Sequence, residues 1–354
     1  MPPLIVPFFI PHAGCPQQCL YCNQHLTARQ LPGLPQSEEI LRTVQKWVRR
    51  SPGRPVETAF FGGSFTLLPI KEQQQLLESV QPLLKQGLVD SVRISTRPDG
   101  LADDILSFLA QYKVRTIEIG VQSLDDAVLQ RSLRGHSAAD SMAAITRVAR
   151  AGFCTGAQLL PGLPGDTPHK ALASLSGVIA AGAQFVRIYP ALVLAGTRLA
   201  EQYAAGEWQP PSLDATIRLC ARMLLMAQKA KIPVIRLGLQ SDEGLLANET
   251  VLAGPWHPAL GQLARGELYY SLVCKMSGLL AEPVTEVVCH PARISDVTGH
   301  KRRNLLRWQK LGLSIKRIYA DACLAPEEIS VQSLNQKMTC SIITNINDKE
   351  ILDA

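Results

Sequence analysis

Apolar and polar positions over the first two thirds of the chain follow two alternating patterns. Short apolar runs recur, and the longer segments between them carry an apolar residue every three or four positions. The first run, from Pro3 to Ile10, is apolar throughout, which is typical of a strand buried on both faces. The short runs predict seven strands, at residues 3–10, 55–61, 91–96, 114–121, 155–160, 184–189 and 234–237.

The longer segments predict helices over residues 37–48, 70–86, 101–112, 137–151, 168–182 and 213–229. Ser37 and Ser137 stand at the start of two of them, where a hydroxyl can accept a hydrogen bond from the first turn, so both are predicted N-caps. Strands that alternate with helices are typical of right-handed βαβ units on a parallel sheet. Because seven strands are one fewer than a closed barrel needs, we expect a partial barrel with its site at the C-terminal strand ends.

The pattern changes after residue 240. Residues 240–265 are loop-like, residues 266–290 include a helix-compatible stretch, and from Arg293 to Arg317 the charged side chains are basic except for Asp296. We therefore predict a barrel over residues 1–240, a C-terminal α/β extension over 241–325 and a weakly determined tail over 326–354.

The composition of the chain limits the number of domains, the state of its cysteines and the compartment that we expect. The chain has 354 residues and 46% hydrophobic residues, enough for one large domain or two ordinary ones. Nine cysteines is an odd number, and six of them are scattered singly, which favours reduced thiols over a disulfide framework. No apolar stretch is long enough to span a membrane, and the first ten residues lack the features of a signal peptide, so we expect a cytoplasmic protein without a membrane partner. The net charge of +6 is mild, so the placement of the charge matters more than its sum.

Three cysteines stand together in the loop after the first predicted strand. Cys15, Cys19 and Cys22 lie within the segment CPQQCLYC. A [4Fe–4S] cluster normally takes four cysteine ligands, so a loop that offers three leaves one iron open to another ligand. Two alternatives remain at this point: a zinc site completed by His12 or His25, and a thioredoxin-like pair of Cys19 and Cys22.

Residues suited to binding a ligand follow the next predicted strands. Adjacent glycines can bring backbone N–H groups close to a ligand, and long polar side chains can hold a carboxylate, a ribose or a phosphate. Arg97 has an alternative role, because it can pair with Asp99 across a turn. The candidates at these strand ends are Gly62, Gly63, Ser64, Arg97, Gln122 and Arg134.

Taken in order, several segments resemble the radical S-adenosylmethionine (SAM) domain of the catalytic subunit of the Elongator complex and its bacterial relatives. These segments are the cysteine loop, FFGGSFT, STRPD, EIGVQS, LRGHS, LLPGLPGDT and VRIYPALVLAGTRL, and the resemblance covers roughly residues 5–240. It implies a partial (β/α)6 TIM-like radical SAM barrel and a [4Fe–4S] cluster on Cys15, Cys19 and Cys22. In that family the open iron binds SAM, and electron transfer cleaves SAM to a 5′-deoxyadenosyl radical.

The resemblance also implies roles for single residues. Those expected to bind SAM are Tyr21, Gly62, Gly63, Ser64, Arg97, Gln122 and Arg134, and no catalytic residue is identified. Two features depart from the Elongator subunit. Its first two cysteines are spaced much more widely, and nothing after residue 240 here resembles its acetyltransferase domain.

The same resemblance implies action on the wobble uridine of tRNA, with an electron donor such as flavodoxin or ferredoxin. The basic segment has the electrostatic character of a phosphate-binding surface, with Trp308 as an interleaved aromatic residue, or it is simply a solvated helix face. The predicted RNA-binding residues are Lys301, Arg302, Arg303, Arg307 and Lys310. Two other functions stay open: a small-molecule radical SAM oxidoreductase of the oxygen-independent coproporphyrinogen oxidase kind, and a zinc-stabilised RNA-binding module without catalysis.

Overall fold

The computed structural model describes residues 3–16, 18–23, 33–239 and 250–351. The chain divides into two compact units. The first contains Met1–Pro210 and Gln240–Gly254, and the second contains Pro211–Leu239 and Pro255–Ala354. His25, one alternative zinc ligand, lies outside the described residues.

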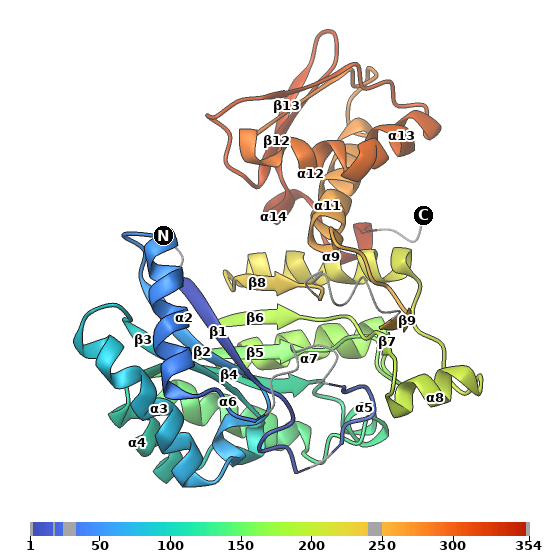
Figure 1. Ribbon diagram of the computed structural model, residues 1–354. Helices are drawn as coiled ribbons and strands as arrows, with labels where there is room; N and C mark the ends of the chain where they lie inside the picture. Colours follow the sequence, from blue (N-terminus) through green and yellow to red (C-terminus); the bar gives the residue numbers. More distant parts are fainter. Residues whose placement is uncertain (1–2, 17, 24–32, 240–249, 352–354) are drawn as a thin grey trace. The chain divides into compact units, whose positions relative to one another are not determined.

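The first unit is built on a curled parallel sheet (Figure 1). Its strands run in the order β1-β2-β3-β4-β5-β6, and every neighbouring pair is parallel. Sequence order and spatial order agree, as expected for successive βαβ units. The predicted partial (β/α)6 barrel is therefore confirmed. The strands are β1 (Leu4–Ile10), β2 (Val56–Gly62), β3 (Ser91–Thr96), β4 (Val114–Gln122), β5 (Cys154–Leu159) and β6 (Phe185–Ile188).

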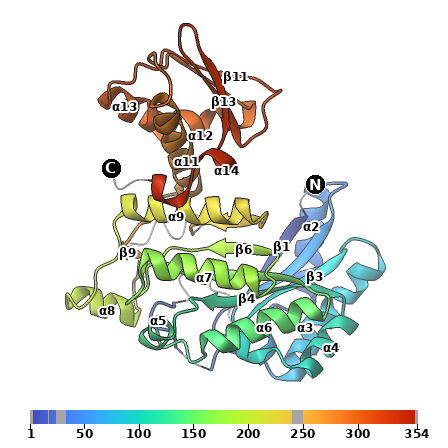
Figure 2. The ribbon, with the colours of Figure 1, turned by 180° about the vertical axis from the view of Figure 1, so that it is seen from behind.

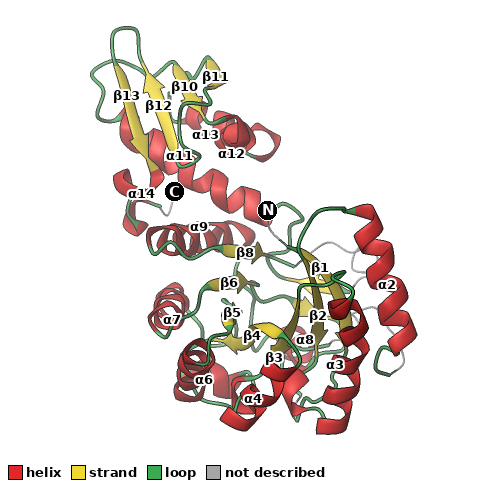
Figure 3. Ribbon diagram, turned by 90° about the vertical axis from the view of Figure 1, so that its left-hand side faces the viewer, coloured by secondary structure: helices red, strands yellow, loops and turns green. Residues whose placement is uncertain are grey.

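Helices connect consecutive strands and cover the outer face of this sheet (Figures 2 and 3). Four short elements were not predicted, because they are too short to show a hydrophobic period: α5 (Asp126–Arg131), β7 (Val193–Leu194), α8 (Arg198–Ala204) and β9 (Val251–Ala253). The predicted helices correspond to α2 (Ser37–Arg50), α3 (Ile70–Lys85), α4 (Asp103–Gln111), α6 (Ala138–Arg150) and α7 (Pro168–Ala180).

The two predicted N-caps differ. Ser137 caps α6 in a capping box, because its side chain accepts from the Asp140 N–H and the Asp140 side chain accepts from the Ser137 N–H. Ser37 is instead the first residue of α2, and Gln36 is the N-cap. The Ser37 hydroxyl lies 2.7 Å from the hydroxyl of Ser79 on α3, so it joins two helices and caps neither.

Strand β1 departs from the expectation of burial on both faces. Leu4, Val6, Phe8 and Ile10 are buried, whereas the residues between them are only half-buried. The reason is its place at the end of the strand order, where one edge has no partner among the described strands. An edge strand also accommodates Pro7, which has no N–H for a second ladder.

Charged side chains fill part of the inside of the curled sheet. Glu118 is fully buried and accepts hydrogen bonds from Arg93, Gln158 and Arg187, at 2.7, 2.9 and 2.9 Å. Arg93 also pairs with Glu57 at 2.6 Å. Each buried charge thus meets an opposite one, which is the condition under which ions are tolerated inside a protein.

The second unit begins with α9 (Leu213–Lys229) and β8 (Val234–Leu237) and continues with α11 (Leu260–Ser277), which packs against α9. A mixed four-stranded sheet follows in the order β11-β10-β12-β13. Its strands are β10 (Glu286–Cys289), β11 (Arg317–Ala320), β12 (Glu328–Gln332) and β13 (Lys337–Ser341), and its helices are α12 (Ile294–Thr298), α13 (Arg303–Lys310) and α14 (Ile342–Asn345). Short 3-10 turns in the two units span Phe65–Leu67, Pro98–Gly100, Pro291–Arg293, His300–Arg302 and Asp348–Glu350.

The unit boundary differs from the one expected from sequence. It falls at residue 210 and not at 240, because α9 packs with α11 of the second unit. Residues 326–351 are also more regular than the weakly determined tail that we expected. They contain two strands with buried Ile329, Val331 and Cys340, whose apolar pattern is too short to stand out in the sequence. Among the described residues, no helix has both the length and the apolar character needed to cross a membrane.

Candidate cofactor site

The cysteine loop packs directly on the glycine turn that follows β2. The Ser64 N–H donates to the Ala13 carbonyl at 2.9 Å. A Cβ on Gly63 would lie 2.1 Å from the Ala13 oxygen, and a Cβ on Gly14, whose φ is +70°, would lie 2.3 Å from the Ser64 oxygen. Both glycines are therefore required by the close approach of two backbones. The sequence led us to expect that this turn approaches a ligand, and in the structure it contacts the cysteine loop.

Two other segments hold the part of the loop that contains the last two cysteines. The Leu20 N–H donates to the Ser132 carbonyl at 3.1 Å, and the Leu20 carbonyl accepts from the Leu199 N–H at 2.9 Å. The Asn23 amide donates to the Ala195 carbonyl at 3.1 Å. The loop is thus fixed on both sides by segments far away in sequence. Asn23 was not among the predicted site residues.

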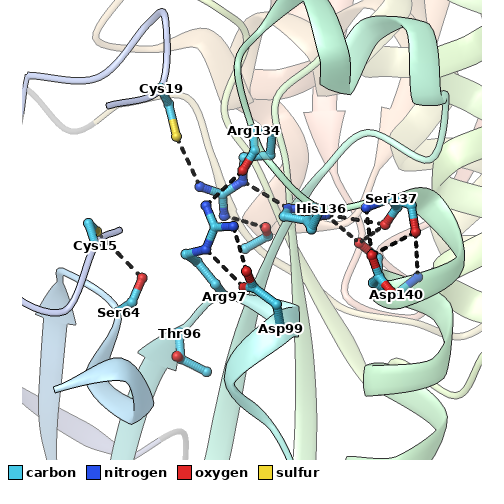
Figure 4. Close-up of polar contacts among 12 residues, drawn as sticks. Cys15, Cys19, Ser64, Thr96, Arg97, Asp99, Arg134, His136, Ser137 and Asp140 are labelled. Atoms are coloured by element: carbon cyan, nitrogen blue, oxygen red, sulfur yellow. Dashed lines mark hydrogen bonds and ion pairs between the residues drawn. The ribbon is translucent and has the colours of Figure 1, made fainter. Parts of the chain in front are cut away.

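The three predicted metal ligands are reduced cysteines that form no disulfide among the described residues. Cys15 Sγ lies 3.4 Å from the Ser64 hydroxyl, and Cys19 Sγ accepts a hydrogen bond of 3.3 Å from Arg134 (Figure 4). Cys19 is buried, whereas Cys15 and Cys22 are half-buried. Within the described part of the chain, no three His, Cys, Asp or Glu side chains come together as a group that could hold a metal ion. The thiols therefore share one loop without forming a closed metal site.

Arg134 is a buried cation beside one of these thiols. It is 8% exposed, and its guanidinium donates to Cys19 Sγ at 3.3 Å, to the Gly120 carbonyl at 2.6 Å and to His136 Nε2 at 3.0 Å. Burial opposes its charge, but Tyr21 and Cys19 hold the pKa of Arg134 above its ordinary value. No carboxylate of the described residues pairs with it. The cation is therefore not neutralised by this part of the protein.

His136 orients that guanidinium. Because His136 Nε2 accepts from Arg134, the ring is neutral and its hydrogen is on Nδ1, which lies 3.2 Å from the Ser137 carbonyl and 3.3 Å from the Ser141 hydroxyl. Burial and the neighbouring Arg134 charge lower the pKa of His136 to about 4. The LRGHS segment contained this residue, but its sequence position did not identify its partner.

Arg97 makes the ion pair that was its alternative role. It is 2% exposed and donates to both carboxylate oxygens of Asp99, at 2.9 and 2.7 Å. Its remaining terminal nitrogen donates to the backbone carbonyl of Arg134 at 2.7 Å (Figure 4). Burial would raise the pKa of Asp99, but the hydrogen bond and charge of Arg97 lower it. Arg97 is thus neutralised by Asp99, and it also fixes the loop that carries Arg134.

Gln122 and Tyr21 each hold a buried polar atom that has no close hydrogen-bond partner in the described part of the chain. Gln122 ends β4 with a φ of +67°, and the Gln122 side-chain carbonyl is buried without a hydrogen bond among the described residues. A Cβ on Gly120 would lie 2.7 Å from the Arg134 guanidinium and 3.1 Å from the Gln122 amide nitrogen, so these groups converge. Tyr21 packs against a small apolar cluster, and its hydroxyl is buried near the Cys19 thiol without a close hydrogen-bond partner among the described residues. Buried polar atoms are normally paired, so both are open positions for a ligand.

The donor set fits an anionic metal–thiolate group beside a polar organic ligand. Three thiols can become thiolates on binding a metal. One of them already accepts a hydrogen bond from a cation that no described carboxylate neutralises, and the same site holds two polar atoms without a close partner in the described ranges.

The basic segment lies in the second unit, and fewer of its cations are available to contact phosphates than its sequence indicated. Arg307 donates to both oxygens of Glu267, at 2.6 and 3.0 Å, and its guanidinium lies 3.4 Å from the ring centre of Tyr270. Arg303 pairs with Asp214 at 2.7 Å. Acids on α9 and α11 thus neutralise two of the five predicted RNA-binding residues.

Trp308 does not serve as an exposed aromatic residue. It is fully buried and stacks on Tyr270 with ring centres 6.1 Å apart. The expectation that it interleaves with exposed cations was wrong, because Trp308 lies on the inner face of α13. Lys301, Arg302 and Lys310 are exposed.

Comparisons with known proteins agree with this fold. Residues 9–176 match the model of the radical SAM superfamily, and residues 183–270 match that of the Radical_SAM C-terminal domain. The chain is 25% identical over 232 residues to the tRNA uridine(34) acetyltransferase of Dehalococcoides mccartyi, covering 55% of this chain and 50% of that protein. It is 27% identical over 192 residues to Elongator complex protein 3 of Saccharomyces cerevisiae, covering 48% of this chain and 34% of that protein.

The chain thus spans half or less of the length of these two relatives. Among solved structures, the archaeal Elp3 of Methanocaldococcus infernus matches with a TM-score of 0.58 and 18% identity, covering 74% of this chain and 61% of that one, which shows a shared fold. The two family models together cover more than half of the chain. The chain belongs to the radical SAM superfamily.

Proposed function

We propose that this radical SAM enzyme holds a [4Fe–4S] cluster on Cys15, Cys19 and Cys22, binds SAM beside it and modifies a nucleoside of tRNA. The observation that carries the proposal is the buried, unneutralised Arg134 guanidinium next to Cys19. Such a charge is costly unless an opposite one approaches it. A thiolate-ligated metal group would bring that charge to this position.

Each residue of the site has a separate task in this proposal. The three thiols give up their protons to bind metal, and Arg134 offsets part of the resulting negative charge. Asn23, Ser132 and Leu199 keep the loop in place through their hydrogen bonds. When bound, the cluster and SAM supply a reductively formed 5′-deoxyadenosyl radical that takes a hydrogen atom from the substrate.

SAM binding is assigned to the polar groups around the end of β4. The Gln122 side-chain carbonyl can accept a hydrogen bond and the Tyr21 hydroxyl can donate or accept one, and neither has a close partner among the described residues. Arg134 uses three of its five N–H groups within the protein and keeps two for an anionic ligand. Gly63 and Ser64 contribute by holding the cysteine loop, Gly62 by pairing with Ile10 at the end of β1, and Arg97 by positioning Arg134.

A tRNA substrate is supported by the relatives and by the exposed cations of the second unit. Relatives are named as tRNA uridine(34) acetyltransferases, so the wobble uridine is the family-level expectation. Lys301, Arg302 and Lys310 are exposed and can contact phosphates. The electron would come from a small reductant protein such as flavodoxin or ferredoxin.

Two measurements test the proposal. Protein purified without oxygen should contain iron and sulfide and should release 5′-deoxyadenosine from SAM with dithionite. Near-stoichiometric zinc without iron would instead indicate the zinc-stabilised module. The nucleosides of bulk tRNA from a deletion strain and its parent should differ by one modification in mass spectrometry. Identical nucleosides would remove tRNA as the substrate and favour a small molecule.

A further inference from the structure

Two buried arginines in the site differ in whether a carboxylate neutralises their charge. Arg97 is 2% exposed and Arg134 is 8% exposed. Arg97 has the Asp99 carboxylate at 2.7 Å. The partners of Arg134 among the described residues are a carbonyl, a neutral imidazole and a thiol. An isolated buried charge is unfavourable, so a negative charge next to Cys19 would stabilise the Arg134 guanidinium.

The orientation of Arg134 is fixed by neighbours on three sides. Gly120 and His136 each accept one N–H of the planar guanidinium, and Arg97 holds the backbone carbonyl of the same residue (Figure 4). A planar fork held at two nitrogens cannot turn without breaking both hydrogen bonds. The third nitrogen is therefore kept 3.3 Å from Cys19 Sγ.

We propose that Arg134 is the charge and hydrogen-bond partner of the Cys19 sulfur in the cluster-loaded protein, and that His136 is the positioning residue that keeps it there. This inference rests on the proposed function, since it needs the cluster. Hydrogen bonds to ligating sulfurs and nearby charge are among the features that set the reduction potential of an iron–sulfur centre. A cation at Cys19 stabilises the state that carries one more electron, so it makes the cluster easier to reduce.

The test is a redox titration of the anaerobically loaded protein, followed by electron paramagnetic resonance in the absence of SAM. Omitting SAM separates this role of Arg134 from SAM binding. At the wild-type midpoint, Arg134→Gln should lower the ratio of reduced to oxidised cluster about tenfold, which for a one-electron couple is a midpoint lower by about 59 mV. Arg150→Gln, on the exposed face of α6, removes an equal charge and should leave the ratio unchanged.

Variants of His136 test the positioning role while Arg134 stays in place. His136→Phe removes the acceptor for Arg134 and should shift the midpoint in the same direction as Arg134→Gln. His136→Gln keeps an acceptor oxygen and should restore much of the wild-type value. If His136 served only to pack the loop, the midpoint would not depend on whether the substituted side chain carries an acceptor atom.

The outcomes separate the inference from the function on which it rests. If the wild type loads a [4Fe–4S] cluster but Arg134→Gln keeps the same iron content and midpoint, the inference is wrong and the proposed function stands. If Arg134→Gln does not fold, as judged by circular dichroism, His136→Phe decides: an unchanged midpoint overturns the inference, and a lowered one supports it. If the wild type loads no cluster, the proposed function itself fails.

Discussion

The backbone carbonyl of Arg134 accepts a 2.7 Å hydrogen bond from the side chain of Arg97, so one arginine of the site fixes the backbone position of the other. Arg97 begins the loop after β3, and Arg134 lies in the segment between α5 and α6. Because Asp99 neutralises Arg97, Arg97 links these two loops without bringing an unpaired charge into the site.

We expect Arg97→Gln to destabilise the protein. The substitution leaves the Asp99 carboxylate without its cation and the Arg134 carbonyl without a donor. Hydrogen bonds to charged groups contribute about 1.5–3 kcal/mol each, so the free energy of unfolding should fall by at least that much. Urea denaturation measures it, and Arg150→Gln is the exposed control. A loss below about 0.5 kcal/mol would show that Arg97 does not link the two loops.

Each of Cys15→Ala, Cys19→Ala and Cys22→Ala should lose the bound iron and the associated visible absorption. A cluster that already has one open iron cannot give up another protein ligand and remain firmly held. Iron and sulfide analysis after anaerobic loading measures this. Cys220 is fully buried on α9 of the second unit, so Cys220→Ala should keep its iron. Full iron content in any of the first three variants would remove that cysteine from the ligand set.

Gly63→Ala should disturb the cysteine loop. The added methyl group would lie 2.1 Å from the Ala13 oxygen and 2.5 Å from the Ile10 oxygen, and both are backbone atoms that cannot move independently of the loop. Overpacking of this kind costs about 1–3 kcal/mol of stability. Thermal unfolding and iron retention measure it together. Gly278→Ala is the control, because its nearest neighbour would be an ordinary 3.5 Å away. Equal behaviour of the two variants would contradict the predicted close approach.

His136 should make stability depend on pH. Burial and Arg134 lower its pKa from 6.5 to about 4 in the folded protein, so between these values the unfolded chain binds more protons than the folded one. The contribution of this pKa difference to the free energy of unfolding is therefore present at pH 7, and it decreases as the pH drops below 6.5. The loss between pH 7 and pH 5 should be about 2 kcal/mol from this group. Urea denaturation of the apoprotein at both pH values measures it, and His136→Gln should lack this part of the slope. An identical slope in the variant would assign the pH dependence to other groups.

The sequence predicted those features whose signal is local. The period of each predicted strand and helix is carried by neighbouring residues, and so are the Ser137 cap and the pairing of Arg97 with Asp99, two positions away. The contact of Arg134 with Cys19 joins residues 115 positions apart, so no local pattern indicated it. The RNA-binding residues show the same limit. The basic run was visible, but Glu267 and Asp214, which neutralise Arg307 and Arg303, lie 40 and 89 positions away.

The basic segment gives the last prediction. Replacing the exposed Lys301, Arg302 and Lys310 with Gln should reduce tRNA affinity and flatten its salt dependence by roughly two to three units of slope, because each lost phosphate contact removes a little less than one. Replacing Arg42, Arg49 and Arg50, which are exposed on α2, removes the same charge from the first unit and should change the slope less. Phosphate contacts do not read base sequence, so cognate and non-cognate tRNA should lose affinity alike. Arg307→Gln should act mainly on stability, since it leaves the buried Glu267 carboxylate without its partner. An unchanged salt slope in the first triple variant would remove this segment as an RNA surface, and a small-molecule substrate would then be the better hypothesis.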